Sequence, residues 1–156
     1  RHIAAACVVS LLQRRLFDTN VSESLRRLQT QVNLEASREA PYDYALPWTV
    51  HHLRAAGLLK EARALLCSSN LVKERAAADM GALIRDYVNL AQSLRGQEGP
   101  SEESDFYERS IETWKTVFGK EHSNVALLLH RFASRLQDQA QFDEAVPLCE
   151  RSLRIR

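Results

Sequence analysis

The chain has 156 residues, of which 45% are apolar, 21 are basic and 20 are acidic, so its formal net charge is +1. Five glycines and four prolines are too few for the many turns of an all-β protein. The even mixture of charges argues against nucleic-acid binding, which requires a concentrated basic face, and against a polybasic membrane anchor.

The three cysteines, Cys7, Cys67 and Cys149, are odd in number, and none belongs to a CxxC pair. Their spacing indicates neither a disulfide framework nor a zinc knuckle, and free thiols on apolar helix faces fit a reducing compartment. The longest apolar run, residues 3–12, is too short to span a bilayer, so no membrane insertion is expected. Because the sequence begins at Arg1 rather than at methionine, we expect it to be a piece of a longer protein.

The chain up to residue 95 has the pattern of consecutive helices. Pro41 ends the second of them, and Pro47 either kinks the third or marks the first turn of a helix that starts near Leu46. Gly57 is expected to end this helix in left-handed backbone geometry. The helices expected here cover residues 2–16, 22–39, 42–57, 58–68, 71–79 and 81–95.

Residues 96–100 (GQEGP) form the only loop with strong helix-breaking chemistry. Ser101 is expected to open the next helix with a capping box, because acidic residues fill its first turn. Ser123 or Asn124 is expected to cap the following helix. The chain then turns at residues 141–143 into a last helix.

The C-terminal part of the chain repeats itself at a shift of 42 residues. The segment YERSI at 107–111 aligns with CERSL at 149–153 without a gap. The same shift aligns Leu90-Ala91 with Phe132-Ala133, Leu94 with Leu136, Glu102 with Glu144, and Phe106 with Leu148. A helix pair repeated at fixed spacing cannot bury its apolar face alone, so neighbouring pairs are expected to stack.

These residues resemble the 42-residue tetratricopeptide repeat of kinesin light chains and nephrocystin-type proteins. The matching positions are Tyr107, Arg109, Ser110, Phe118, Gly119, His122, Val125, Ala126, Leu129, Phe132, Ala133, Leu136, Phe142, Glu144, Ala145, Pro147, Leu148, Arg151, Leu153 and Ile155. The preceding unit, from about Leu83, is degenerate, because Glu103 replaces Ala145 and Pro100 replaces Phe142. The resemblance implies an all-α fold, an α-solenoid of antiparallel helix pairs.

The repeat pattern also has a physical explanation. Small Ala133 and Ala145 allow the two helices of a pair to approach closely, and Phe142 is expected to plug the turn between them. Glu144 and Arg151 are expected at exposed positions. The seam is expected to be filled by Leu129, Phe132 and Leu136.

In repeats of this kind the first helix of each pair lines a concave groove that takes a segment of another protein. Carried over position by position, the groove is expected to comprise Arg85, Val88, Gln92, Arg95, Leu127, His130, Ser134, Gln137 and Asp138. Arg85 and Arg95 would supply charge, and Val88 and Leu127 apolar contact. Such a strip suits a partner segment with acidic residues beside a hydrophobic anchor.

A Leu-Pro-aromatic, His-Leu, Ala-Gly and Leu-Leu pattern occurs earlier, at Pro47, Trp48, His52, Leu53, Ala56, Gly57, Leu65 and Leu66. It resembles the helical arm that follows the nucleotide-binding module of STAND signalling ATPases. The two resemblances divide the chain into an arm over residues 1–80 and repeats over 81–156. This order is that of nephrocystin-type proteins, which implies a cytoplasmic, ciliary location and a whole protein that binds ATP outside this chain.

Motifs for catalysis, cofactors or metals do not stand out. The chain has neither GxxxxGK[ST] nor GxGxxG, so no nucleotide or other cofactor is expected. Adjacent His51 and His52 point about 100° apart on a helix and cannot hold one ion together. His52 is therefore expected in the core and His51 in solvent. Trp48 and Trp114 are expected to be core anchors, and Cys149 a small buried hydrophobe.

Two hypotheses about function follow. The leading one is a non-catalytic scaffold, whose groove binds a peptide or helix of a partner protein. The alternative is the regulatory arm and sensor segment of a STAND-type nucleotide-driven switch. An enzyme is the least favoured class, because a structural role explains every Ser, Cys and His. A phosphate-binding module upstream of Arg1 would distinguish the first two hypotheses.

Overall fold

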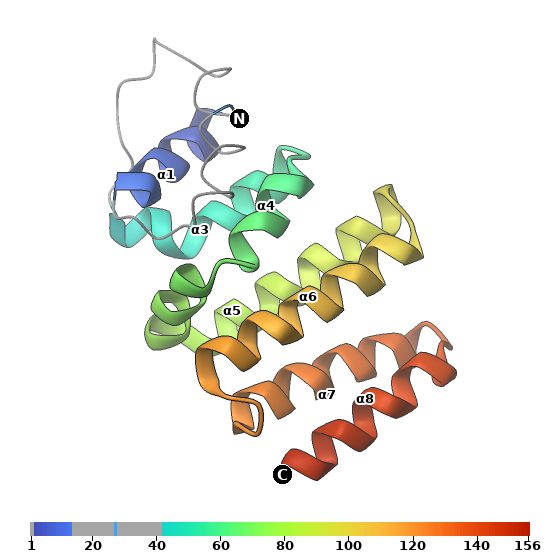
Figure 1. The fold of residues 1–156 in the computed structure, drawn as a ribbon. Helices are drawn as coiled ribbons and strands as arrows, with labels where there is room; N and C mark the ends of the chain where they lie inside the picture. Colours follow the sequence, from blue (N-terminus) through green and yellow to red (C-terminus); the bar gives the residue numbers. More distant parts are fainter. Residues whose placement is uncertain (1, 14–26, 28–41) are drawn as a thin grey trace. The chain divides into compact units, whose positions relative to one another are not determined.

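The computed structural model describes residues 2–13, 27 and 42–156 (Figure 1). Within these residues the regular structure is helical throughout, as the fold class predicted. Of the helix expected over 22–39, only Arg27 lies within the described residues. The helices are α1 (His2–Gln13), α3 (Tyr42–Ala55), α4 (Leu59–Leu66), α5 (Ser69–Gln97), α6 (Pro100–Phe118), α7 (Ser123–Asp138) and α8 (Phe142–Ile155).

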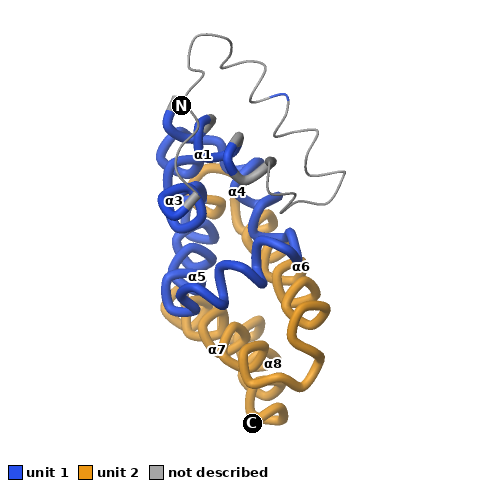
Figure 2. The backbone as a smooth tube through the Cα atoms, turned by 90° about the vertical axis from the view of Figure 1, so that its left-hand side faces the viewer, with its two compact units in different colours: residues 1–93 blue, residues 94–156 orange. Residues whose placement is uncertain are grey.

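The chain forms two compact units, residues 1–93 and residues 94–156 (Figure 2). In the first unit, α3 packs against both α1 and α4. Its core includes Cys7, Val8, Ala45, Leu53, Leu65 and Leu66. Tyr87 is fully buried, and its hydroxyl donates a hydrogen bond to the Leu66 carbonyl.

Helix α3 decides between the two expectations for Pro47. The helix begins at Tyr42, so Pro47 lies inside it, and the expectation of a helix starting near Leu46 is wrong. Two turns later the helix ends as expected, because Gly57 adopts a left-handed φ of 76°. The Leu58 amide bonds the Leu53 carbonyl at 2.9 Å and the Gly57 amide bonds the Arg54 carbonyl at 3.0 Å, which is the Schellman pattern.

Helix α5 is broken at Asp79, where φ is −159° and ψ is 98°. The Asp79 carboxylate accepts a hydrogen bond from the Ala82 amide at 3.0 Å, so Asp79 acts as the N-cap of the second half. The two separate helices expected here are therefore two halves of one broken helix. Buried Arg75 and part-buried Asp86 form an ion pair between the halves.

The second unit contains the end of α5 together with α6, α7 and α8. Helix α7 packs against both α6 and α8 (Figure 1). The connections are short, and each depends on a left-handed residue: Gly99 before α6 (φ 106°), Gly119 after it (φ 105°), and Ala140 before α8 (φ 59°). Short turns of this kind bring consecutive helices back antiparallel, as the repeat pattern predicted.

Two helix starts differ from the sequence predictions. Helix α6 begins at Pro100 with Gly99 as N-cap, so the capping box expected at Ser101 is wrong. Proline has no amide hydrogen and a preset φ, which suits the first helical position and moves the start one residue earlier. Helix α7 is capped by His122, whose Nδ1 accepts a hydrogen bond from the Asn124 amide at 3.1 Å.

The pair α7 and α8 follows the repeat closely, with departures at Phe142 and at Arg151, which is half-buried where an exposed position was expected. Ala133, Ala145 and the three seam residues Leu129, Phe132 and Leu136 are all buried, as predicted. Phe142, which was expected to plug the turn, is exposed instead. The left-handed Ala140 and the bond from the Gln141 amide to the Leu136 carbonyl (2.9 Å) close the turn without it.

Candidate functional site

The exposed face of α7 carries the groove residues expected in the second unit. His130, Gln137 and Asp138 are exposed, and Leu127 and Ser134 are half-buried. Their spacing of three or four residues places them on one side of the helix, opposite the seam that α7 buries. The structure therefore brings these five residues together on a single face.

Arg131 belongs to the same face and was missed by the sequence reasoning. It lies four residues after Leu127 and is exposed, so it shares this side of the helix with the apolar position. The groove positions carried over from the resemblance do not include Arg131. Its spacing of four residues from Leu127 would have identified it. We call Leu127, His130, Arg131, Ser134, Gln137 and Asp138 the α7 face.

The remaining groove residues come from α5. Arg85 and Gln92 are exposed and Val88 is half-buried, and all three belong to the first unit. That they line the same surface as the α7 face stays a prediction. Arg95 belongs to the second unit and is half-buried.

Arg95 takes part in an ion network that the sequence reasoning did not foresee. Its Nη1 donates to Glu103 Oε2 and to Gln141 Oε1, both at 3.1 Å. Arg135 Nε donates to the other oxygen of Glu103 at 3.1 Å. Arg95 is therefore held by its own unit, and substituting it would disturb the fold as well as any partner contact.

Glu103 is the centre of this network and is buried, with 1% of its side chain exposed. Besides the two arginines, Tyr107 Oη donates to Glu103 Oε1 at 2.6 Å and Gln139 Nε2 donates to the same oxygen at 3.3 Å. Burial, and then the adjacent carboxylate, raise the pKa of Tyr107. The glutamate that marked the first repeat as degenerate is thus fully paired.

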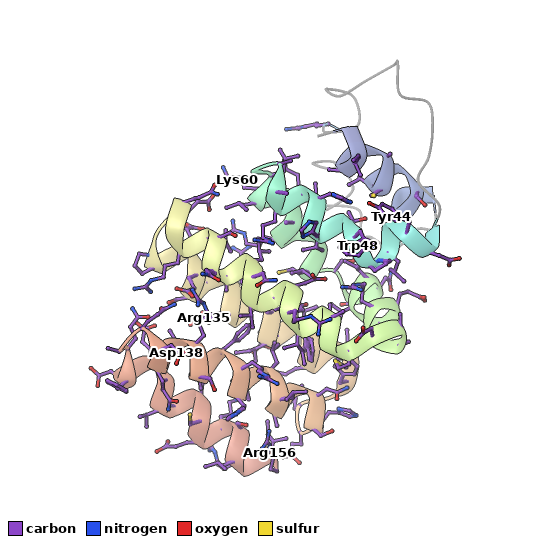
Figure 3. The ribbon with its side chains drawn as sticks, turned by 180° about the vertical axis from the view of Figure 1, so that it is seen from behind. Tyr44, Trp48, Lys60, Arg135, Asp138 and Arg156 are labelled. Carbon is purple, nitrogen blue, oxygen red and sulfur yellow. The ribbon has the colours of Figure 1, made fainter. Side chains whose placement is uncertain are left out.

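The α7 face and the Glu103 network lie on the same helix but differ in what they can do. Figure 3 labels Arg135 and Asp138 near the C-terminal end of α7. Arg135 points into the network, whereas Asp138 is exposed. The network holds the end of α7 in position, whereas the α7 face lies outside it.

In the first unit, α3 presents four neighbouring rings, from Tyr44, Trp48, His51 and His52. Tyr44 Oη lies 2.7 Å from His52 Nε2, and the Tyr44 ring stacks on Trp48 with centroids 6.3 Å apart. Trp48 is exposed, so its expected place in the core is wrong, whereas Trp114 is fully buried as predicted. Helices α1 and α4 contact α3, and of its four rings those of Tyr44, Trp48 and His51 are exposed.

Two further expectations about single residues are only partly met. His51 is exposed as expected, but His52 is half-buried rather than part of the core. Burial, and then the neighbouring His51, lower the pKa of His52. Cys149 is also half-buried, and its Sγ lies 3.7 Å from Gln137 Nε2. Among the described residues, no group of three His, Cys, Asp or Glu side chains could hold a metal ion.

None of the described helices combines the length and the apolar composition needed to cross a membrane. A comparison with protein families matches residues 87–124 and residues 125–156 to the family described as Tetratricopeptide repeat. The two matched segments follow each other directly and include α6, α7 and α8. Comparisons with curated proteins and with solved structures found no match. The resemblance of the front half to a STAND arm therefore stays a prediction.

Proposed function

We propose that the α7 face binds a segment of a partner protein, with Leu127 as the apolar contact and Arg131 as the charge beside it. Tetratricopeptide repeats generally mediate contacts between proteins, and α7 is the first helix of the second matched repeat. The observation that carries the proposal is the combination of a tightly held helix with an exposed mixed face.

Rigidity supports this use of α7. Its apolar side is buried, His122 caps its start, and the Glu103 network holds its last turn through Arg135. A helix held in this way loses little conformational entropy when a partner binds, so more of the contact energy appears as affinity. The α7 face therefore does not have to order itself on binding.

The chemistry of the face favours an extended or helical segment that has an acidic residue beside an apolar side chain. The apolar side chain would contact Leu127, and the carboxylate would pair with Arg131. A charge-assisted hydrogen bond of this kind contributes about 1.5–3 kcal/mol. Arg131 takes the role that the sequence assigned to Arg95, because Arg95 is already bound to Glu103.

Arg131→Glu tests the proposal at an exposed residue that is not a member of the network. The matched control is Lys120→Glu, which makes the same change of charge at an exposed residue outside the α7 face. A photo-reactive amino acid at His130 would identify the captured segment, and the same group at exposed Glu108 would report background. We expect Arg131→Glu to abolish the His130 adduct and Lys120→Glu to leave it.

The melting temperature of both variants should match that of the parent chain, because both positions are exposed. If Arg131→Glu and the parent chain gave equal adduct at His130, the charge on this face would have no part in binding. If adducts formed only from Glu108, the binding surface would lie on another helix.

A further inference from the structure

Helix α5 is broken at one residue, although its sequence does not require a break. Asp79 has non-helical backbone angles, and we call residues 69–78 and 80–97, on either side of it, the first and second halves of α5. The 29 residues from Ser69 to Gln97 contain no proline, and three alanines, the best helix formers, lie directly before Asp79. Asp79 favours the break only as a cap.

An apolar stripe runs through the break with the spacing of one continuous helix. Its members follow each other at intervals of four, four, three, four and three residues, and they are Val72, Ala76, Met80, Leu83, Tyr87 and Leu90. A continuous helix would place all six on one side. Four of them are buried, whereas Ala76 and Met80, which flank the break, are half-buried. The apolar pattern therefore fits a helix without a break.

The ion pair between Arg75 and Asp86 exists only because α5 bends. The two residues are 11 positions apart in the sequence. In a continuous helix they would lie about 16 Å apart along the axis, beyond the combined reach of their side chains. In the bent structure the guanidinium and the carboxylate are in direct contact. The pair therefore stabilises the bent form alone.

A hydrogen bond of Tyr87 also depends on the bend. Its hydroxyl donates to the carbonyl of Leu66, which lies three residues before the start of α5 at Ser69. A continuous helix would place Tyr87 about 27 Å from Ser69. The three residues back to Leu66 span at most about 11 Å. Tyr87 can therefore reach Leu66 only in the bent form.

Arg75 makes the bent form sensitive to the charge of Asp86. The Arg75 side chain is 2% exposed, and its Nε has no hydrogen-bond partner within the described part of the chain. A buried guanidinium that loses its carboxylate is strongly disfavoured. In a continuous helix Arg75 would lie at the edge of the apolar stripe, where a long side chain can extend to water. Loss of the Asp86 charge therefore favours the continuous form.

We infer that α5 is a two-state hinge, bent while Arg75 pairs with Asp86 and continuous from Ser69 to Gln97 when the pair is released. The hinge gives the second half two positions relative to α4, and Tyr87 is attached to α4 only in the bent one. The inference does not depend on partner binding, because the hinge involves no residue of the α7 face. The two proposals can therefore fail independently.

A distance between two probes on the whole chain tests the hinge. Lys73 and Asn89 are exposed and lie in different halves, and non-natural amino acids can carry a probe at each without altering the native cysteines. A continuous helix would separate them by about 24 Å along its axis, and the bent form by less. We expect the parent chain to show the shorter distance.

Two substitutions should shift the hinge toward the continuous form. Asp86→Asn should raise the fraction with the longer distance by about tenfold or more, because it removes the countercharge of Arg75. Asp79→Ala retains the ion pair but removes the acceptor of the Ala82 amide and adds a good helix former, so a rise of about fivefold is expected. Exposed Asp143→Asn makes the same charge change in α8 and should leave the distance unchanged.

Met80→Pro should reverse the effect of Asp86→Asn. Met80 is the first residue after the cap Asp79, a position that suits proline, whereas proline inside a continuous helix removes a hydrogen bond and clashes with the preceding turn. The double variant should therefore return to the shorter distance. This reversal distinguishes a continuous helix from local unfolding, which proline would not prevent.

A single short distance in either Asp86→Asn or Asp79→Ala, with helical circular dichroism retained, would overturn the inference. If Asp86→Asn did not fold, the distance in Asp79→Ala would decide. A longer distance that persists after Met80→Pro is added would also overturn the inference, because the two halves would then be separated by something other than a continuous helix.

Discussion

Removing Arg135 from the Glu103 network should destabilise the second unit far more than removing a surface ion pair. In Arg135→Ala, Glu103 loses one of its two cations while remaining 1% exposed, so a carboxylate without full compensation stays out of water. Breaking a buried ion pair in this way costs about 3–5 kcal/mol. Arg95, Tyr107 and Gln139 still donate to Glu103, which lowers the expected cost below this range, to about 2–3 kcal/mol.

Removing the glutamate instead should cost less. The arginine side chains are 30% exposed at Arg95 and 18% at Arg135, so both guanidiniums can turn toward water in Glu103→Ala. The main loss is then the acceptor for the buried hydroxyl of Tyr107, about 1–3 kcal/mol. Alanine is also the residue that the later repeat has at this position, as Ala145.

The double variant Glu103→Ala with Arg135→Ala measures the coupling free energy between these two residues. Once the glutamate is absent, removing Arg135 leaves no buried carboxylate without its partner. The double variant should therefore be about 1–2 kcal/mol more stable than the sum of the two single losses predicts. Urea unfolding of the four chains gives the coupling free energy. The exposed pair Arg109 with Asp105 is the control, and its coupling should be below about 1 kcal/mol.

Additive losses in this cycle would show that Arg135 does not neutralise Glu103 in solution, and the explanation of the degenerate repeat would be wrong. The coupling should also persist in 1 M salt, because burial protects the network from screening, whereas the control pair should lose its coupling. A network coupling that disappears in salt would mean that Glu103 is open to water.

Ala145→Leu should overpack the contact between α7 and α8 and cost about 1–3 kcal/mol, because Ala145 is fully buried. Exposed Glu150→Ala should leave the melting temperature nearly unchanged. Equal shifts of the melting temperature in the two variants would contradict the repeat register. The pKa of His52 in the folded chain lies below the ordinary value of 6.5, so the folded state disfavours its charged form. The free energy of unfolding should therefore depend on pH in a definite direction. Stability should therefore fall as the pH drops below about 6.5, and His52→Gln should reduce this loss; an unchanged pH profile would show that the ring is equally hydrated in the unfolded chain.

The helices could be predicted from the sequence because the signals are local. Apolar spacing of three and four residues, the GQEGP loop and the left-handed Gly57 all act within one or two turns of the chain. The seam of the repeat was predictable for a related reason. Positions 42 residues apart share one environment, so buried Ala133 and Phe132 follow from the pattern.

Even the local signals did not decide every helix end. Ser101 offered good capping chemistry, but Gly99 and Pro100 start the helix earlier, because proline lacks an amide hydrogen and has a preset φ, which suit the first helical position. The sequence predicts Ser123 or Asn124 as the cap of α7, since histidine is not a common one, yet the His122 ring nitrogen accepts a hydrogen bond from the Asn124 amide. Competing caps one or two residues apart differ too little in free energy to be ranked from sequence.

By itself, the sequence determined the helical fold, the repeat and its apolar seam, because each depends on spacing along the chain. Only the tertiary structure decided which sides of the helices remain in solvent. Trp48 and Phe142 occupy apolar-periodic positions and are exposed, because the neighbouring helices cover other sides of α3 and α8. Likewise, Glu103 and Arg135 are 32 residues apart and meet only when α6 and α7 pack together. Periodicity records which side of a helix is apolar, whereas burial and pairing depend on what packs against it.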